Sequence, residues 1–487
     1  MTNFTMPLFS VAVPEIFVLC MACIVLLVDV FVKERFRWVT YALVQLTLVI
    51  GFLLTLQQYH DYPQPIVTFS GHYVLDKLAV LTKLFIFVVS FFAFIYANLY
   101  IKERRMSRGD YYILGLFAVL GMQVMASAYS FLTIFLGLEL STLPLYAMVA
   151  MQKDSRVAIE ASMKYFVMGA LASGLLLYGI SIVYGATGSF EIFGMAGLLQ
   201  NASSTQQAAL LLALVFILAG IIFKFGAVPF HMWVPDVYTG APTTVTLFIA
   251  SAPKIAAFAI TMRILVEAFP ALTSHWQHAL IAVSILSMFG GNLLAIAQTN
   301  IKRMLAYSSI AHIGYTFLGI LAGPVDPQGY SAAMFYIVTY VIVAAGAFAI
   351  ISILSTHNIE LDQLDDYRGL NARSPWLAFM MLLLMFSMAG VPPTVGFFAK
   401  LGLLEALVAA HYVWLAALAL LFAIVGAYYY LRVVMLMYFE EPKSNLVGTH
   451  ISVTPSLMAA ISINGVAALI LGLLPSGLID LCRISVS

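Results

Sequence analysis

Runs of roughly 20 apolar residues follow one another along almost the whole chain, and they restrict its fold more than any other feature. Hydrophobic residues fill 63% of the 487 positions and charged residues only 9%, against about 25% charged in a typical soluble domain. No soluble core could bury so much apolar surface. The runs also lack the strict alternation of membrane β-strands. The sequence therefore predicts an all-α integral membrane protein.

Hydropathy over windows of ~20 residues predicts about 14 transmembrane helices. Their approximate cores are 9–32, 38–57, 77–100, 111–127, 130–150, 157–184, 207–238, 241–268, 278–297, 303–322, 330–354, 375–409, 412–437 and 454–474. The first run has no basic segment before it and is too long for a cleaved signal peptide. We therefore expect it to be the first span.

Most of the basic residues outside the spans follow odd-numbered spans, which predicts the orientation of the chain. These residues are Lys33, Arg35, Arg37, Lys102, Arg104, Arg105, Arg108, Lys153, Arg156, Lys302, Arg303, Arg368, Arg373 and Lys443. Positively charged loops stay in the cytoplasm. Both termini should then lie on the far side of the membrane, which in a bacterium is the periplasm.

Two predicted spans contain helix breakers. Span 7 contains Pro229 and Pro235, and span 12 contains Gly390, Pro392 and Pro393. Such breaks persist in a membrane only where protein or a wet cavity surrounds them. Each broken span is the fourth in a group of five, and an odd number of spans inverts the second group relative to the first. The expected division is 1–110 for helices 1–3, 111–270 for one five-helix unit, 271–440 for its inverted repeat, and 441–487 for the last helix.

Charge and cysteine usage exclude several classes of function. A formal net charge of +1, with no glycine-rich phosphate loop, argues against a nucleic-acid partner. Cys20 and Cys23 form a CxxC inside the first span without a basic neighbour, so packing is expected rather than redox chemistry. With Cys482 the chain has only three cysteines, too few for an iron–sulfur cluster of the four-thiolate kind.

Five charged residues fall deep within predicted spans: Glu139, Lys164, Lys224, Lys254 and Lys400. Each buried charge costs roughly 2.5–3.5 kcal/mol on insertion scales, so these groups must be paired, hydrated or neutral. Other basic residues within spans lie near span ends, where snorkelling is expected. They are Lys77, Lys83, Arg263, Arg432 and Arg483.

A structural ion pair is the simplest explanation of a deep charge. One pair between Glu139 and a lysine would explain two of the five groups and leave three lysines without a deep acidic partner. Desolvation favours the neutral form of a lysine, and a nearby carboxylate favours the charged form. A change in their separation would then act as a proton switch that needs no cofactor.

Two histidines and one aspartate accompany these groups. His231 follows Lys224 by two helical turns, which predicts a proton relay, with simple packing as the alternative. His312 lies in AYSSIAHIGY beside hydroxyl groups. That polar stripe could hydrate a channel or bond between helices, and both readings stay open. Asp236 is expected to cap the next helix rather than to collect protons.

Several long motifs together resemble the antiporter-like subunits of respiratory complex I, the NADH–quinone oxidoreductase. They are KFGAVPFHMWVPDVYTGAPTTVT, GLELSTLPLY, QTNIKRMLAYSSIAHIGY, AGVPPTVGFFAK and the lysine of ASAPKIAAF. The resemblance covers spans 4–13, and within the family PDVYTGAP and the chain length are typical of the N-type branch. It implies two inverted five-helix units joined by buried charges along the middle of the membrane.

The same resemblance implies roles for individual residues. Glu139 would tune Lys224, Lys254 would link two half-channels with His231 between them, and Lys400 would be the exit-side group. Lys164 matches the family's lysine on span 6. The chain would then be a proton-translocating subunit in a bacterial inner membrane, among other membrane subunits of the complex. No cofactor is expected here, because flavin, iron–sulfur clusters and quinone would belong to partner subunits.

Three other functions stay open at this point. A subunit of a multi-component cation/proton antiporter would have the same ancestry, and a sodium requirement would favour it. A scaffold that does not pump would keep its activity without the deep lysines. A quinone-binding subunit is the third alternative, although the sequence has no distinctive site for a quinone.

Overall fold

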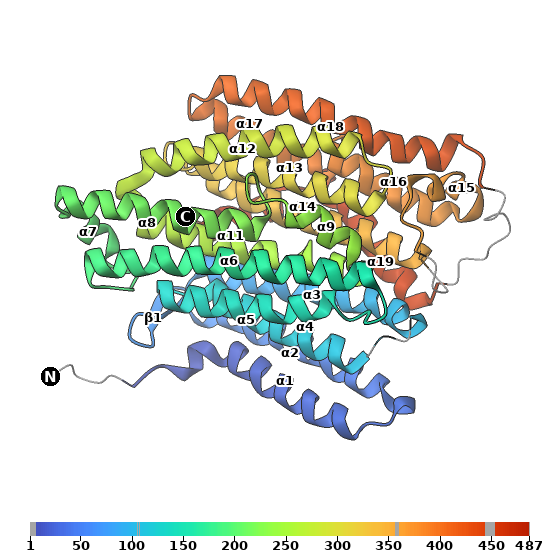
Figure 1. Ribbon diagram of the computed structural model, residues 1–487, viewed down its shortest axis with the longest axis horizontal. Helices are drawn as coiled ribbons and strands as arrows, with labels where there is room; N and C mark the ends of the chain where they lie inside the picture. Colours follow the sequence, from blue (N-terminus) through green and yellow to red (C-terminus); the bar gives the residue numbers. More distant parts are fainter. Residues whose placement is uncertain (1–5, 105, 107, 356–359, 444–452, 487) are drawn as a thin grey trace.

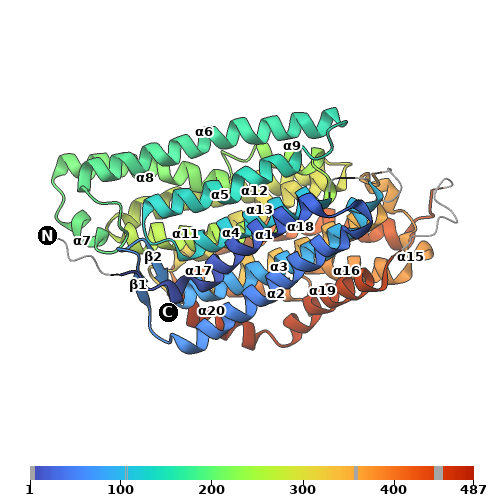
Figure 2. The same cartoon turned by 90° about the horizontal axis from the view of Figure 1, so that it is seen from below.

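The computed structural model describes residues 6–486 apart from 105, 107, 356–359 and 444–452. Nearly all of the described chain is helical, and the long helices lie side by side along one axis (Figures 1 and 2). Long helices that follow one another along the chain alternate in direction, so the loops gather at the two ends of the bundle. The basic loops lie together at one end, because Lys443 pairs with Asp366 and Arg104 pairs with Glu360 there. We call this the basic end.

The N-terminal part contains three long helices and a small hairpin. Its elements are η1 (Phe9–Ala12), α1 (Val13–Phe31), η2 (Glu34–Phe36), α2 (Trp38–Asp61), β1 (Ile66–Thr68), β2 (Tyr73–Leu75) and α3 (Lys77–Glu103). The strands pair antiparallel, with Val67 opposite Val74. The side chain of Asp76 caps α3 by accepting a hydrogen bond from the amide of Ala79, as expected for an aspartate at this position.

The next helices contain the first broken span. They are α4 (Arg108–Ser127), α5 (Phe131–Val149), α6 (Arg156–Thr187), α7 (Met195–Gln200), α8 (Ser204–Phe225), α9 (Trp233–Gly240), α10 (Thr243–Ile249) and α11 (Ala252–Met262), which a π-helical turn, η3 (Arg263–Ala268), extends. α6 is 32 residues long and borders this group (Figure 2).

The remaining helices contain the second broken span. They are η4 (Pro270–Leu272), α12 (Thr273–Ile296), α13 (Ile301–Ala322), α14 (Gln328–Leu354), η5 (Leu364–Tyr367), α15 (Leu370–Arg373), α16 (Pro375–Ala389), α17 (Val395–Ala409), α18 (Val413–Phe439), α19 (Pro455–Leu473) and α20 (Ser476–Val486).

The predicted fold class is confirmed. Within the described residues, 13 helical segments are long and apolar enough to span a membrane, and α16 is a shorter apolar helix. Together α16 and α17 form the broken twelfth span, so the expected plan of about 14 spans agrees with the structure. The division at residues 110, 270 and 440 stays a prediction.

Burial separates the central helices from those that face lipid. The apolar windows of Thr243–Ala268, Ile301–Ala322 and Gln328–Leu354 are 100%, 94% and 94% buried, whereas those of α1, α6 and α18 are 39%, 33% and 33% buried. The broken eighth span, α13 and α14 therefore form the core of the bundle, and lipid or partner subunits must cover the outer helices.

The two predicted breaks begin with the same local geometry. Gly226 ends α8 at φ +75° and Gly390 ends α16 at φ +87°. The amide after each glycine bonds back to a carbonyl of the last turn, from Ala227 to Ile222 and from Val391 to Phe386. This is a left-handed glycine cap of the Schellman type, which satisfies helix-end carbonyls where no solvent is present.

The eighth span contains a third break that the sequence analysis missed. α10 ends at Ile249 and α11 begins at Ala252, with Ser251 at φ −115° and ψ −102° between them. Pro253 occupies the first turn of α11, where its missing amide hydrogen costs nothing. That proline was the available signal. The break places Lys254 in the first turn of a new helix at the centre of the bundle.

Candidate functional site

Lys224 lies in the last turn of α8, just before the first break. Its ammonium donates to the hydroxyls of Ser141 (3.2 Å) and Thr142 (2.6 Å) on α5. Glu139, one turn away on α5, attracts Lys224 electrostatically but makes no direct ion pair with it among the described contacts. The Oε1 atom of Glu139 is buried without a hydrogen-bond partner. The structure thus places Glu139 and Lys224 near each other, as predicted, but without a direct ion pair among the described contacts.

Lys254 lies at the third break and is 4% exposed. Its ammonium donates to the hydroxyl of Ser309 on α13, and it lies over the ring of Tyr340 at 4.9 Å from the centroid. Both partners are neutral. A ring face attracts a cation most strongly where water is excluded.

Lys400 lies on α17, after the second break, and its side chain reaches back to the end of α16. Its ammonium donates to the carbonyls of Met388 (3.0 Å) and Ala389 (2.8 Å). These are unpaired carbonyls at a helix C-terminus, where the helix dipole favours a cation. The ring of Tyr315 lies 5.6 Å away.

His312 on α13 lies between Lys254 and Lys400. Its Nδ1 is 2.7 Å from the hydroxyl of Tyr336, and its Nε2 is 2.9 Å from that of Tyr430. The imidazole stacks on Tyr340, the ring that also contacts Lys254. In this conformation the hydroxyl groups near His312 bond between helices, as Ser308 does with Tyr430. This arrangement agrees with the interhelical alternative for the polar stripe.

Small cavities adjoin the lysines of both predicted breaks. One of about 20 Å³ touches both His312 and Lys400, and one of about 10 Å³ touches Lys224 and Thr142. A cavity needs roughly 10–15 Å³ to hold a water molecule. The cavity beside His312 and Lys400 is therefore large enough for one water molecule.

The structure corrects the placement of His231. The residue lies in the segment between α8 and α9 rather than on a helical face shared with Lys224. It is half-buried, and its Nδ1 has no hydrogen-bond partner. The glycine cap at Gly226 and Pro229 end the helix before the second turn. A role as a relay stays a prediction.

The structure also corrects Lys164 and Asp236. The side chain of Lys164 is 42% exposed on α6 and pairs with Glu160 (2.9 Å) and Asp236 (2.8 Å). Lys164 is therefore neither buried within this chain nor without an acidic partner. Asp236 lies in the first turn of α9 and pairs with Arg303 as well, at 3.2 Å. It does not cap α10, whose N-cap is Pro242 without a side-chain bond.

The prediction of snorkelling is wrong for two basic residues. Lys83 is fully buried and pairs with Glu15. Arg263 is 2% exposed and pairs with Asp76 and Glu267, each at 2.6 Å. Burial raises the pKa of Asp76, but the Arg263 guanidinium holds this pKa below its ordinary value. Glu15 and Asp76 belong to other elements, so the hydropathy of one span could not reveal them, whereas Glu267 follows Arg263 by four residues and was a local signal.

The cysteines and the possible metal ligands remain to be placed in the structure. Cys20 and Cys23 are exposed on α1, so they do not pack inside this chain as expected. Within the described residues, no three His, Cys, Asp or Glu side chains cluster as metal ligands.

The sequence analysis missed the tyrosines that surround His312. Tyr336 and Tyr340 lie one turn apart on α14, and Tyr429 and Tyr430 lie on α18. Tyr429 extends the hydrogen-bonded chain from Tyr430 (3.1 Å) to Asn292 on α12 (3.1 Å). The spacing in YIVTY was the available signal, since hydroxyl groups four residues apart share one face of a helix.

The buried groups thus form two assemblies. Lys254, His312 and Lys400 are contiguous through Tyr340 and one small cavity. Glu139, Lys224 and the hydroxyls of α5 form a separate group. In the first assembly the lysines can gain or lose a proton without leaving a fixed counter-charge behind. In the second, the Glu139 carboxylate stays near Lys224 whatever the charge of the lysine.

Comparison with known proteins identifies the family of this chain. A family model described as "NADH:quinone oxidoreductase/Mrp antiporter, TM" matches residues 128–426, the region that contains both assemblies. The chain belongs to this family. Among its relatives, NADH-quinone oxidoreductase subunit N of Thioalkalivibrio sulfidiphilus (strain HL-EbGR7) is 50% identical over 485 residues, or 100% of both chains. The subunit N of Coxiella burnetii (strain RSA 493 / Nine Mile phase I) is 50% identical over 99% of both.

Solved structures of the family share the whole fold. A chain of respiratory complex I from Thermus thermophilus with bound aureothin matches with a TM-score of 0.81 and 32% identity, over 96% of this chain and 98% of that one. A chain of the Mrp complex from Dietzia sp. DQ12-45-1b matches with a TM-score of 0.83 and 21% identity, over 97% of both. The second likeness shows the fold alone.

Proposed function

We propose that this chain is a proton-translocating membrane subunit of a bacterial NADH–quinone oxidoreductase. Relatives of this name match it over their full length at about half of all positions. The observation that carries the proposal is that Lys224, Lys254 and Lys400 are each held by neutral hydroxyls, carbonyls or rings. A structural role would have favoured a direct acidic partner for each of them.

The first step of transfer takes place in the first broken span. Glu139 stabilises the ammonium form of Lys224, and the hydroxyls of Ser141 and Thr142 hold it in position. When Lys224 moves away from Glu139, it loses that stabilisation and releases its proton. The proton then passes toward Lys254, whose contacts with Ser309 and Tyr340 involve no fixed charge.

The second step leads from Lys254 to the second broken span. His312 accepts the proton, and the water-sized cavity beside it carries the proton to Lys400. His231 relays protons at the first break, and Lys164 senses charge from the surface of α6. The direction is from the cytoplasm to the far side, with the basic end in the cytoplasm and both termini periplasmic.

Partner subunits supply the driving reaction and cover the exposed faces. NADH oxidation, flavin and iron–sulfur chemistry and quinone reduction take place in those subunits, and this chain contributes the translocating part of the enzyme. α6 presents Met163, Val167 and Leu171 at 57%, 57% and 67% exposure around Lys164. A charged group in an apolar face fits a neighbouring membrane subunit better than lipid.

The test is Lys224→Ala in the assembled complex, in membrane vesicles. NADH-driven acidification and NADH–quinone turnover are recorded together, and Lys77→Ala, an exposed lysine at the start of α3, is the control. Loss of both activities per assembled complex supports an obligatory proton path through Lys224. Retention of both would make Lys224 structural and favour the scaffold.

A cation/proton antiporter subunit is the second candidate, because the matching family also includes the Mrp antiporters. Replacing sodium by choline in the vesicle assay separates the two functions. Unchanged acidification in choline supports proton translocation, whereas a strict requirement for sodium would support the antiporter.

A further inference from the structure

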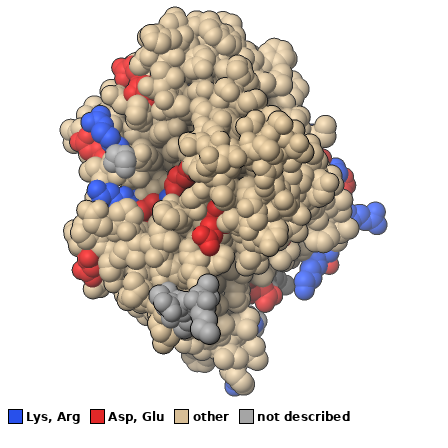
Figure 3. All heavy atoms as spheres, turned by 90° about the vertical axis from the view of Figure 1, so that its left-hand side faces the viewer, with Lys and Arg blue, Asp and Glu red and all other residues tan. Residues whose placement is uncertain are grey.

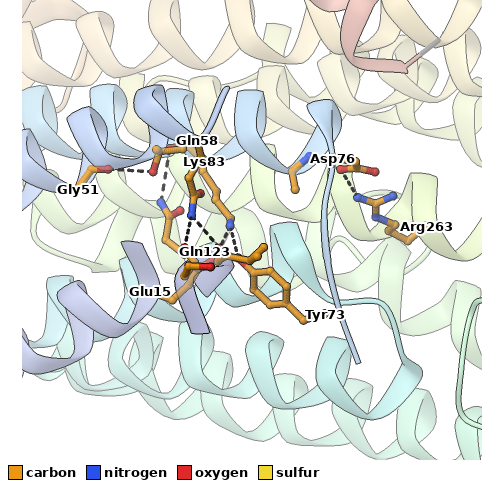
Figure 4. A network of polar contacts seen from close by, with 12 residues as sticks. Glu15, Gly51, Gln58, Tyr73, Asp76, Lys83, Gln123 and Arg263 are labelled. Carbon is orange, nitrogen blue, oxygen red and sulfur yellow. Dashed lines mark hydrogen bonds and ion pairs between the residues drawn. The ribbon is translucent and has the colours of Figure 1, made fainter. Parts of the chain in front are cut away.

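A second cluster of buried charges lies among the N-terminal helices, away from the lysines described above (Figure 4). Lys83 of α3 is fully buried, and Glu15 of α1 is 7% exposed. Tyr73 of β2, Gln58 of α2 and Gln123 of α4 lie around them. Five elements therefore enclose a single ion pair, which the proton path proposed above does not use.

A buried ion pair of this kind is hard to explain by stability alone. Its desolvation cost often exceeds the Coulombic gain, and apolar residues of similar volume usually stabilise a fold as well or better. Lys83 lies six residues inside α3, roughly 9 Å from the start of the helix. Snorkelling to solvent is not available to a side chain that is fully buried.

The direct contacts leave part of the pair's hydrogen-bonding capacity unused. The ammonium of Lys83 has three donor hydrogens. One goes to the carboxylate of Glu15 and one to the hydroxyl of Tyr73 at 2.9 Å. The same hydroxyl lies 3.0 Å from the carbonyl of Val11 and 3.1 Å from Oε1 of Glu15. Within the part of the chain that the structure describes, the third N–H of Lys83 has no acceptor.

Three buried oxygen atoms in the cluster have no hydrogen-bond partner among the described residues. They are Oε2 of Glu15, Oε1 of Gln58 and Oε1 of Gln123. Leaving a buried polar atom unpaired costs about 1–3 kcal/mol. All three are acceptors, so the species that satisfies them must donate hydrogen bonds. Water does so, and it can also accept the free N–H of Lys83.

We propose that Glu15, Lys83 and Gln123 hold a cluster of buried water molecules, and that the Glu15–Lys83 pair exchanges a proton with this water on the far side of the membrane. One water accepts from Lys83 and donates to Oε2 of Glu15. Another donates to Oε1 of Gln123. Buried waters of this kind typically make about three hydrogen bonds to such groups.

The first step of the exchange keeps the net charge of the pair at zero. A proton moves from Nζ of Lys83 to Oε1 of Glu15, so an N–H bond breaks, an O–H bond forms, and an amine faces a carboxylic acid. The acid then releases its proton to water as hydronium. The amine regains a proton from the next hydronium that reaches the cluster.

The cluster also connects electrostatically to the helix that bears Lys254. The charge of Lys83 acts on Asp76, and Asp76 pairs with Arg263 at 2.6 Å. Arg263 directly continues α11, nine residues after Lys254. Figure 4 shows both pairs at the N-terminal end of α3. A change of charge at Lys83 therefore alters the field at the far end of the broken eighth span.

The water site is tested by cryo-electron microscopy of the assembled complex at a resolution that shows waters. Density is expected within hydrogen-bond distance of Oε2 of Glu15 and Oε1 of Gln123, and Gln123→Leu should remove the second density. Gln45→Leu is the control, since its Oε1 is also without a partner. A dry pocket in the wild-type complex would overturn the site.

The proton exchange is tested with the double variant Glu15→Gln/Lys83→Met. Because it removes both charges, it leaves no ion unpaired. It therefore serves as the test if Lys83→Met alone fails to assemble. Because a positioned acid–base group contributes about 10²–10⁴-fold, acidification per assembled complex should fall at least roughly tenfold. The matched control is Asp29→Asn/Arg37→Met, which removes an ion pair at the other end of α1. Equal loss in this control would overturn the specific role of Glu15 and Lys83.

This inference rests on the proposed function, and the two can fail separately. Normal acidification in Glu15→Gln/Lys83→Met, while Lys224→Ala abolishes it, would overturn the exchange site and leave the proposed function standing. Normal acidification in both variants would overturn the proposed function. Loss in both, with the control unaffected, supports the exchange site.

Discussion

The two predicted broken helices begin with the same glycine cap but hold their lysines by different means. Lys224 precedes Gly226 and is held by two hydroxyls of α5, with Glu139 nearby. Lys400 follows Gly390 and returns to the carbonyls that end α16. A buried cation can thus be stabilised by a neighbouring helix or by the C-terminal end of the half-helix before the break.

The difference has a consequence for the charge left behind on deprotonation. When Lys224 loses its proton, the Glu139 carboxylate stays charged nearby, whereas Lys400 leaves only neutral carbonyls. The first site therefore responds to the distance between two side chains. The second responds to the proton that reaches it through His312 and the adjacent cavity.

The largest expected effect is that of Lys400→Ala. Acidification should fall by about 10²-fold, the lower range for a positioned acid–base group, with normal assembly because no carboxylate loses its partner. Lys224→Ala should stop pumping similarly but assemble less well unless combined with Glu139→Gln. Acidification is measured in vesicles, and assembly by native gel electrophoresis. Poor assembly of Lys400→Ala alone would remove the distinction between the two sites.

The glycine caps should differ in their tolerance of a methyl group. Gly226→Ala should destabilise the folded complex by about 2–3 kcal/mol, because left-handed backbone costs 1–2 kcal/mol and the new Cβ would overlap Val234. Gly390→Ala should cost about 1–2 kcal/mol, since the new atom meets the flexible side chain of Lys400 at 3.0 Å.

Thermal unfolding of the purified complex measures both changes. Gly174→Ala in α6 is the control, because a Cβ there meets nothing within 4 Å and alanine favours a helix. Equal destabilisation by Gly226→Ala and Gly390→Ala would show that backbone conformation alone, without the neighbouring side chains, sets the cost at both breaks.

Glu139→Gln tests the feature that only the first site has. Removing the carboxylate charge should slow acidification roughly tenfold, which corresponds to about 1.4 kcal/mol of lost stabilisation of the Lys224 ammonium. Glu191→Gln, at an exposed position in a loop, serves as the reference for a lost acidic charge. Wild-type acidification in Glu139→Gln would mean that the hydroxyls alone position Lys224, as the carbonyls do for Lys400.

The smallest effect is expected where the loop after α14 contacts α3 and α10. Glu360, in the loop after α14, accepts hydrogen bonds from Tyr100 of α3 and Thr243 of α10. Burial raises the pKa of Glu360, but the charges of Lys302 and Arg104 hold this pKa below its ordinary value. A lowered pKa stabilises the fold above the unfolded value of about 4.3. That stabilisation disappears as the pH falls through the folded value.

Thermal unfolding of wild type and Glu360→Gln between pH 7 and pH 3.5 tests whether this stabilisation disappears as the pH falls. The wild type should be more stable from pH 7 down to about pH 5, and the difference should shrink as the pH falls below about 4. Glu440→Gln, which removes an exposed partner of Arg368, is the comparison. A difference that does not change with pH would mean that hydrogen bonding, not charge, stabilises the contact.

Local sequence was sufficient for the spans, for two of the three breaks and for three of the deep lysines. Hydropathy over one helix length decides insertion, and Pro229 and Pro393 interrupt their helices wherever these pack. Lys224 and Lys400 lie at the two predicted breaks, whereas local sequence indicated only that Lys254 is deep within its span. The third break needed one more local signal, Pro253, which stands in the first turn of α11.

Tertiary structure alone decided which charges are buried and what they contact. Lys164 and Lys83 both stand in apolar helices, yet one is 42% exposed beside Asp236 and the other is fully buried beside Glu15. His312 meets Tyr430 across 118 residues, and Tyr100 meets Glu360 across 260. A helix sequence specifies its apolar length, but the rotation and neighbours of each helix depend on packing against distant segments, and these determine the partner of every buried charge.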